Sequence, residues 1–243
     1  MPLREMVRGS LHPDALPFTV HLQELRRRLL RSLGWVALGM GAAWVKSEAL
    51  LSWLIEPAGK VVYLSPTEPF FLQLAVAFWG GGVLACPFLA WETWSFLSPG
   101  LLARERRWIA FLIPCAGFLF LVGAWLAFRF LVPLALSFLL RFGGESMTPM
   151  ISAGHYFGFV VGLALAGGIM FQTPVVVLVL TRMGLVRPVT LLAQWRVALI
   201  GILVAAAALT PTPDVVSQLL ISFPMAGLYF LSVVLSYVAF RAD

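Results

Sequence analysis

Long runs without a single charged residue are the feature that most restricts how this chain can fold. Four such runs, at 69–91, 108–128, 156–181 and 215–240, contain 21 to 26 residues each. A helix needs about 20 residues to cross the hydrocarbon core of a bilayer, which is about 30 Å thick, because each residue adds about 1.5 Å. The runs therefore predict membrane-spanning helices and an all-α, polytopic membrane protein.

The composition indicates the same class of protein. Hydrophobic residues make up 60% of the 243-residue chain and charged residues only 12%, whereas soluble domains carry roughly 25% charged residues. So few charged side chains cannot cover a soluble fold without leaving large apolar patches exposed. Lipid is therefore the expected solvent, and a disordered chain or a disulfide-stapled secreted module is excluded.

Two shorter runs complete a set of six predicted spans. The first is long enough only if it begins at Leu29 and includes Arg31, and the fifth must begin near Leu191 because it ends before Pro211. Residues 197–209 amount to about 20 Å of helix, so we expect short fifth and sixth spans and a thinner bilayer beside them. One membrane domain, 1–243, is expected to contain spans at about 29–46, 70–95, 108–128, 156–180, 191–209 and 215–240.

The basic residues predict the orientation. With six spans, 13 of the 17 basic residues fall on the side of the N-terminus and the remaining 4 on the other side. Lysine and arginine accumulate on the cytoplasmic side of membrane proteins, so both termini are expected to be cytoplasmic. Segments 46–68 and 141–154 then lie outside as interfacial caps. Orientation explains the net charge of +6, so we expect no nucleic-acid partner.

Motifs of an intramembrane enzyme are absent from the sequence. It contains no H-E-x-x-H and no G-x-S-x-G, and all three histidines lie at or outside the ends of predicted spans. We therefore predict no enzymatic activity, no cofactor and no metal site. A small-solute transporter or channel is the alternative function, but it would require ionisable groups near the middle of the bilayer, and the predicted spans contain almost none.

Gln172, two residues before Pro174, is the most central polar side chain of the predicted spans. It either marks a polar cavity or forms an interhelical hydrogen bond beside a proline kink, which would contribute about 0.6 kcal/mol. The sequence leaves both interpretations open.

Four polar blocks lie at the predicted membrane edges. HLQELRRRLL (21–30) precedes the first span and WSFLSPGLLARERR (94–107) follows the second, while FQTP (171–174) and LTPTPD (209–214) occur later, the last followed by Ser217 and Gln218. In this order and at these spacings, the blocks closely resemble the TatC family, the multispanning receptors of the twin-arginine protein translocase.

The resemblance implies a function at the cytoplasmic face of a bacterial inner membrane. Such a receptor binds folded precursors through signal peptides that carry two consecutive arginines. It mediates their export under the proton-motive force, as several copies in a complex with TatA- and TatB-type single-span subunits. The family's recognition carboxylates match Glu24 and Glu105, and the resemblance implies that the same signal-peptide site includes Arg26, Phe96 and Arg106.

A second set of positions is implied to contact partner subunits or to form a polar cluster. It consists of Gln172, Thr210, Asp214 and Gln218. The chain departs from the family pattern at two of these places. Gln172 stands where many relatives have a glutamate, and the extra residue in Thr-Pro-Thr-Pro-Asp shifts Asp214 and Gln218 by one position relative to Thr210.

The chemistry of Glu24 and Glu105 fits recognition of arginine pairs. Each charge-assisted contact between a carboxylate and a guanidinium contributes about 1.5–3 kcal/mol, and lysine cannot reproduce the planar fork. The alternative is a structural role, since Glu24 precedes Arg28 at the i,i+4 spacing that contributes about 0.3–0.5 kcal/mol. The residues alone favour the structural role, and the resemblance favours recognition.

Overall fold

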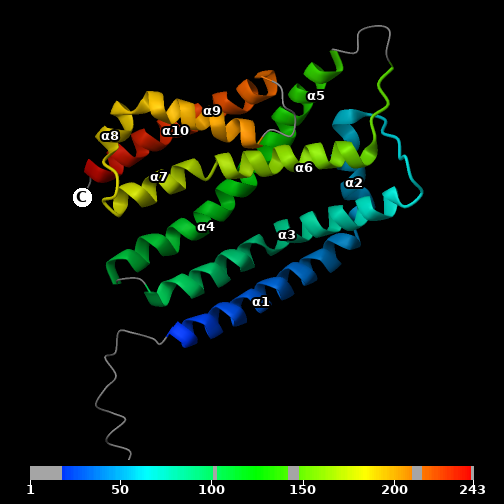
Figure 1. Ribbon diagram of the computed structural model, residues 1–243. Coiled ribbons are helices and arrows are strands. Elements are labelled where there is room, and N and C mark those ends of the chain that lie inside the picture. Colours follow the sequence, from blue (N-terminus) through cyan, green and yellow to red (C-terminus); the bar gives the residue numbers. More distant parts are fainter. Residues whose placement is uncertain (1–17, 101–102, 142–147, 210–214, 242–243) are drawn as a thin grey trace, which may run out of the picture.

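The computed structural model describes residues 18–100, 103–141, 148–209 and 215–241. Helices follow one another through nearly all of this part of the chain, and no β-strand forms within it. The predicted all-α class is therefore confirmed. Figure 1 shows the long helices lying side by side in a bundle, with short helices at its ends.

The first three helices form one side of the bundle. Helix α1 (Phe18–Trp44) leads through α2 (Ser47–Ile55) and a 3₁₀ turn (Glu56–Ala58) to α3 (Glu68–Leu97), which packs along α1 in the opposite direction. Helix α1 begins well before the predicted start at residue 29, because the arginine-rich block continues the same helix. Helix α3 agrees closely with the span predicted at 70–95.

Helix α4 (Ala103–Leu126) does not end with the predicted third span. It continues through a π-helical segment (Ala127–Leu131) into α5 (Val132–Arg141). The π segment ends two residues before Pro133, whose ring nitrogen cannot donate to the carbonyl one turn earlier. The chain at 129–141 therefore continues the third helix as one stretch, Arg106–Arg141, and does not form a separate span.

The fourth predicted span is divided into two helices. Two residues separate helix α6 (Ala153–Met170) from α7 (Thr173–Arg182), which has Pro174 in its first turn. Pro174 lacks the amide hydrogen that would donate to the carbonyl of Met170, one turn earlier, and its ring crowds that carbonyl. The break at Phe171 and Gln172 therefore follows from Pro174.

The last helices correct one expectation about length. After the short α8 (Pro188–Ala193), α9 (Trp195–Leu209) has only 15 residues, about 22 Å of helix, as expected for a short fifth span. Helix α10 (Val215–Arg241) has 27 residues, so the sixth helix as a whole is not short. No charged residue interrupts it before Arg241, and it continues through Pro224.

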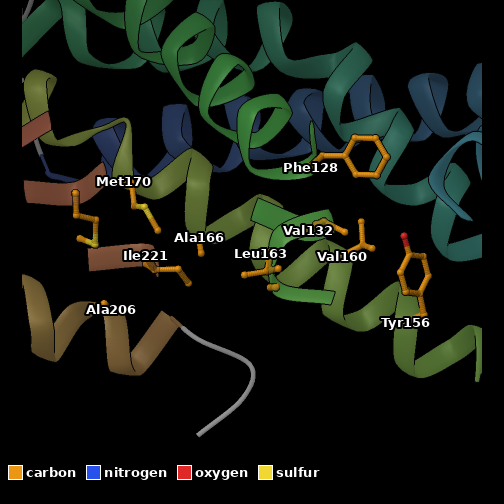
Figure 2. Packing of buried hydrophobic residues seen from close by; sticks show 11 residues of the cluster. Phe128, Val132, Tyr156, Val160, Leu163, Ala166, Met170, Ala206 and Ile221 are labelled. Atoms are coloured by element: carbon orange, nitrogen blue, oxygen red, sulfur yellow. The ribbon is translucent and has the colours of Figure 1, made fainter. Parts of the chain in front are cut away.

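The main hydrophobic core lies between helices of the second half of the chain. Figure 2 shows side chains of α6 meeting those of the α4–α5 helix, α9 and α10. A smaller cluster connects α3 with α6 through Leu72, Val76, Ala153 and Phe157. The core residues labelled in Figure 2 are Phe128, Val132, Tyr156, Val160, Leu163, Ala166, Met170, Ala206 and Ile221.

Many large apolar side chains face away from these cores, including Leu38, Phe111 and Phe223. Among the described residues, three helical stretches are long and apolar enough to cross a membrane: Glu68–Leu97, Arg106–Arg141 and Ala153–Arg182. An apolar outer surface over such helices is what a lipid solvent requires. The count of six spans and the single domain stay predictions.

The two segments predicted as caps contact each other. The amide of Val62 donates to the carbonyl of Ile151 at 2.9 Å, and the amide of Ala153 donates to the carbonyl of Val62 at 2.8 Å. Glu68 closes the junction by accepting hydrogen bonds from the amides of Leu64 (2.7 Å) and Gly154 (2.7 Å). The start of α3 and the start of α6 are thereby joined at one end of the bundle.

Candidate functional site

The opposite end of the bundle collects the basic residues. Figure 1 places the start of α1, the end of α3, the start of α4, the link between α7 and α8, and the end of α10 together there. We call this the arginine-rich end, after Arg26, Arg28, Arg106 and Arg187. The start of α1 and the end of α10 lie on the same side of the bundle, as the charge distribution predicts for these helices.

Glu24 and Arg28 lie one turn apart on α1 at this end. The Arg28 Nη2 donates to Glu24 Oε1 at 3.2 Å, and the two side chains are 22% and 28% exposed. The i,i+4 pair predicted as the structural role of Glu24 is therefore present. Because the carboxylate keeps part of its surface open, the pair does not exclude a further partner.

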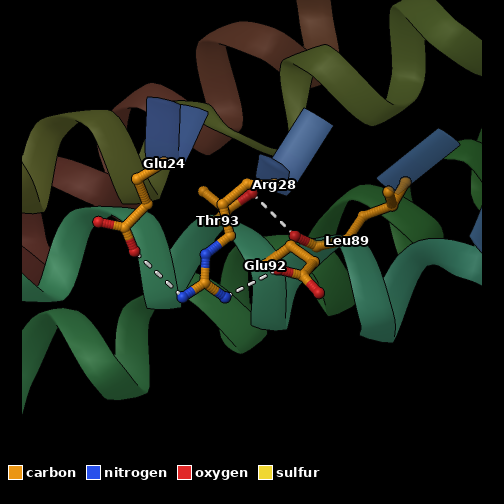
Figure 3. A network of polar contacts seen from close by, with 5 residues as sticks. All are labelled: Glu24, Arg28, Leu89, Glu92 and Thr93. Carbon is orange, nitrogen blue, oxygen red and sulfur yellow. Dashed lines mark hydrogen bonds and ion pairs between the residues drawn. The ribbon is translucent and has the colours of Figure 1, made fainter. Parts of the chain in front are cut away.

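A second carboxylate completes this contact from another helix. The Arg28 Nη1 donates to Glu92 Oε2 at 2.8 Å, and the Glu92 side chain on α3 is only 8% exposed. Figure 3 shows the Arg28 guanidinium lying between Glu24 and Glu92. An arginine stays charged in proteins, and the hydrogen bond to Glu92 raises the pKa of Arg28 further above its ordinary value. Arg28 is therefore a charged bridge between the two acids.

The packing of α1 against α3 sets this geometry. Three contacts fix the register of the two antiparallel helices: Arg28 with Glu92, the stacked rings of Trp35 and Phe88, and the close backbone approach of Gly39 and Gly81. The rings of the stacked pair have centroids 4.3 Å apart. Arg28 therefore meets Glu92 because the whole interface holds it there.

Glu92 is not among the residues predicted for this site. Its charge only ended a charge-free run, and it lies 64 positions from Arg28. The available signal was an acidic residue in the last turns of an apolar helix, near an arginine-rich block on the same predicted side of the membrane. A carboxylate in such a place requires a partner, because burying an unpaired charge is costly.

An open pocket of about 330 Å³ lies beside the Glu24–Arg28 pair. Its lining residues all come from α1: Gln23, Glu24, Arg27, Arg28 and Arg31. One carboxylate thus faces a pocket with three guanidinium groups around it. Such a surface repels a generic polybasic segment and accepts a cation only where it can reach the carboxylate.

The other residues predicted for this site are only partly described. Arg26 on α1 and Arg106 on α4 are exposed, and Phe96 in the last turn of α3 is half-buried. Glu105 belongs to the first turn of α4, but its side chain lies outside the described residues. The predicted approach of Glu24 to Glu105 therefore stays a prediction.

The second set of predicted residues serves other helix pairs. The Gln172 amide Nε2 donates to the carbonyl of Ala116 on α4 at 3.0 Å, which favours the interhelical hydrogen bond over a polar cavity. The Gln218 Nε2 on α10 donates to the carbonyl of Leu203 on α9 at 3.0 Å. Thr210 and Asp214 lie outside the described residues, so a cluster that includes them is not tested.

Comparisons with known proteins agree with one another. Residues 20–224 match the family model described as Sec-independent protein translocase protein (TatC). The TatC protein of Deinococcus radiodurans is 38% identical over 232 residues, which cover 91% of this chain and 86% of that protein. The TatC protein of Aquifex aeolicus is 35% identical over 234 residues, which cover 93% of this chain and 97% of that protein.

A solved structure is similar along almost the whole chain. The crystal structure of the twin arginine translocase receptor TatC in DDM superposes with a TM-score of 0.75 at 33% sequence identity. The superposition covers 89% of this chain and 99% of that one.

Proposed function

Because this chain belongs to the TatC family of Sec-independent protein translocase proteins, we propose that it binds twin-arginine signal peptides at its arginine-rich end. Family membership makes the chain a multi-pass membrane protein and a component of a protein translocase, which is a receptor and not an enzyme. The specific proposal concerns the ligand and the residues that bind it.

The observation that carries this proposal is the contact between Glu24 and Arg28. This contact supports the proposal because the Glu24 carboxylate accepts one guanidinium, that of Arg28, at 3.2 Å and is still 28% exposed. In the proposed complex, Glu24 and Glu105 accept the two arginines of the peptide, while Arg26, Phe96 and Arg106 line the same surface. Arginine is preferred over lysine because only its planar fork offers paired donors to a carboxylate.

The proposed setting is the inner membrane of a bacterium, with the arginine-rich end in the cytoplasm. The positive-inside rule supports this orientation. The proposed partners are TatA- and TatB-type single-span subunits, which associate with several copies of this chain and use the proton-motive force to export folded precursors. We propose that Gln172, Thr210, Asp214 and Gln218 contact these subunits, because polar side chains form hydrogen bonds between helices in lipid, where apolar surfaces alone do not drive association.

Equilibrium binding to the protein in lipid nanodiscs tests the ligand. Fluorescent signal peptides with two arginines or two lysines would be titrated against the wild-type protein and the variants Glu24→Gln and Glu105→Gln. Glu48→Gln, on the exposed surface of α2, is the matched control because it removes a carboxylate far from the site.

The wild-type protein and the Glu48→Gln control should prefer the twin-arginine peptide by about tenfold or more. A loss of one charge-assisted contact corresponds to about 1.5–3 kcal/mol, and each 1.4 kcal/mol is a factor of ten. Glu24→Gln and Glu105→Gln should each reduce the preference sharply. Equal affinity for both peptides in the wild-type protein would overturn the proposed function.

A further inference from the structure

We propose that Glu92 is a positioning residue of the signal-peptide site: it retains Arg28 so that Glu24 can exchange Arg28 for an arginine of the peptide. The inference rests on the proposed function and adds to it a residue on α3. Without a signal peptide, Arg28 then occupies the position beside Glu24 that an arginine of the peptide takes in the complex.

The two contacts of Arg28 are unequal in a way that suits exchange. The distance from Nη1 to the buried Glu92 is 2.8 Å, and the distance from Nη2 to the more exposed Glu24 is 3.2 Å. Short, buried, charge-assisted hydrogen bonds are the stronger ones. An incoming guanidinium therefore displaces Arg28 from Glu24 more easily than from Glu92.

The charge of the three side chains explains why Glu92 is needed. Two carboxylates and one guanidinium carry a net charge of −1, which an arginine of the peptide neutralises. Without Glu92, Arg28 would neutralise Glu24 completely, and only the surplus positive charge of Arg27 and Arg31 would face the peptide. Glu92 therefore balances the charge of Arg28, so that the partly exposed Glu24 keeps a negative charge available to the ligand.

Glu92 acts through Arg28 and not by direct contact. Its side chain is almost entirely covered on α3, whereas the pocket lies along α1. The neighbouring Thr93 hydroxyl does not compete for the bridge, because it donates to the carbonyl of Leu89 at 2.8 Å (Figure 3). The guanidinium of Arg28 is thus the connection between the buried acid and the exposed one.

The exchange is tested by the affinity of a twin-arginine peptide for the protein in nanodiscs. Glu92→Gln should weaken binding about tenfold, which is about 1.4 kcal/mol, because Arg28 is then held by Glu24 alone. The double variant Glu92→Gln with Arg28→Gln should recover most of that loss, since Glu24 no longer has an internal partner. If Glu92 only joined the helices, the double variant would bind as weakly as Glu92→Gln.

Arg28→Lys tests the same exchange without removing a charge. Lysine can remain beside Glu92 but lacks the fork that reaches two carboxylates at once, so the peptide should bind about threefold more tightly than to the wild-type protein, the effect of about one neutral hydrogen bond. Weaker binding to Arg28→Lys, unchanged binding to Glu92→Gln, or no recovery in the double variant would each overturn the inference.

The preference of the wild-type protein for two arginines over two lysines separates this inference from the proposed function. If that preference is present and depends on Glu24 while the Glu92 variants behave like the wild-type protein, only the role of Glu92 fails. If the wild-type protein shows no preference, the proposed function fails and the inference fails with it.

Discussion

The triple glycine at 80–82 on α3 allows a sharp test of how α1 and α3 are held together. A Cβ atom added to Gly81 would lie 2.6 Å from the Met40 Cα and 2.8 Å from the Gly39 carbonyl carbon. These are backbone atoms of α1, so they cannot turn aside as a flexible side chain could. A Cβ added to Gly82 meets nothing within 4 Å.

Gly81→Ala should therefore destabilise the protein relative to Gly82→Ala. Both variants gain the same helix propensity, up to about 1 kcal/mol for replacing glycine in a helix, so this term cancels in the comparison. What remains is the cost of forcing two helices apart, about 1–3 kcal/mol for an overpacked contact. At about 2–4 °C per kcal/mol for a chain of this size, the unfolding midpoints should differ by about 2–12 °C.

The two free cysteines provide the assay. Cys86 and Cys115 are both half-buried, so a dye that fluoresces on reacting with thiols reports their exposure as the protein unfolds in detergent. All variants would be heated at one scan rate, because unfolding of membrane proteins is commonly irreversible. Equal midpoints for Gly81→Ala and Gly82→Ala would refute the close helix crossing and the register that brings Arg28 to Glu92.

Two further predictions concern single polar side chains. Gln172→Leu removes the hydrogen bond to the Ala116 carbonyl and should lower the unfolding free energy by about 0.6 kcal/mol. The same dye assay should show the unfolding midpoint about 1–2 °C lower, and an unchanged midpoint would contradict an interhelical role. Glu68→Ala removes the acceptor of the Leu64 and Gly154 amides, so hydrogen exchange should accelerate at both amides. Unchanged protection of these amides would show that Glu68 does not join the two caps.

The helices could be predicted largely from the spacing of charges. Runs without charge at 69–91 and 108–128 became α3 and the α4–α5 helix, because helices satisfy their own backbone hydrogen bonds in lipid. The break at Gln172 followed from Pro174, a local effect. The extension of α1 back to Phe18 did not follow, because an arginine-rich helix cannot be recognised from apolar length alone.

The site could be predicted only where its chemistry is local. Glu24 and Arg28 are neighbours on one helix, so their pairing follows from a spacing of four residues. The pairing of Arg28 with Glu92 depends on the register of two helices, which in turn depends on where glycine permits their backbones to approach. The sequence contains Gly39 and Gly81, but it does not indicate which of the three glycines at 80–82 faces α1.

The most direct test of recognition at the arginine-rich end is site-specific crosslinking. A photoreactive amino acid would be placed at Gln23, which lines the pocket, or at Tyr63, which is exposed at the opposite end. We predict that a twin-arginine signal peptide labels position 23 strongly, that its twin-lysine version labels it weakly, and that neither labels position 63. Equal labelling of position 23 by both peptides, or stronger labelling at position 63, would contradict recognition by this surface.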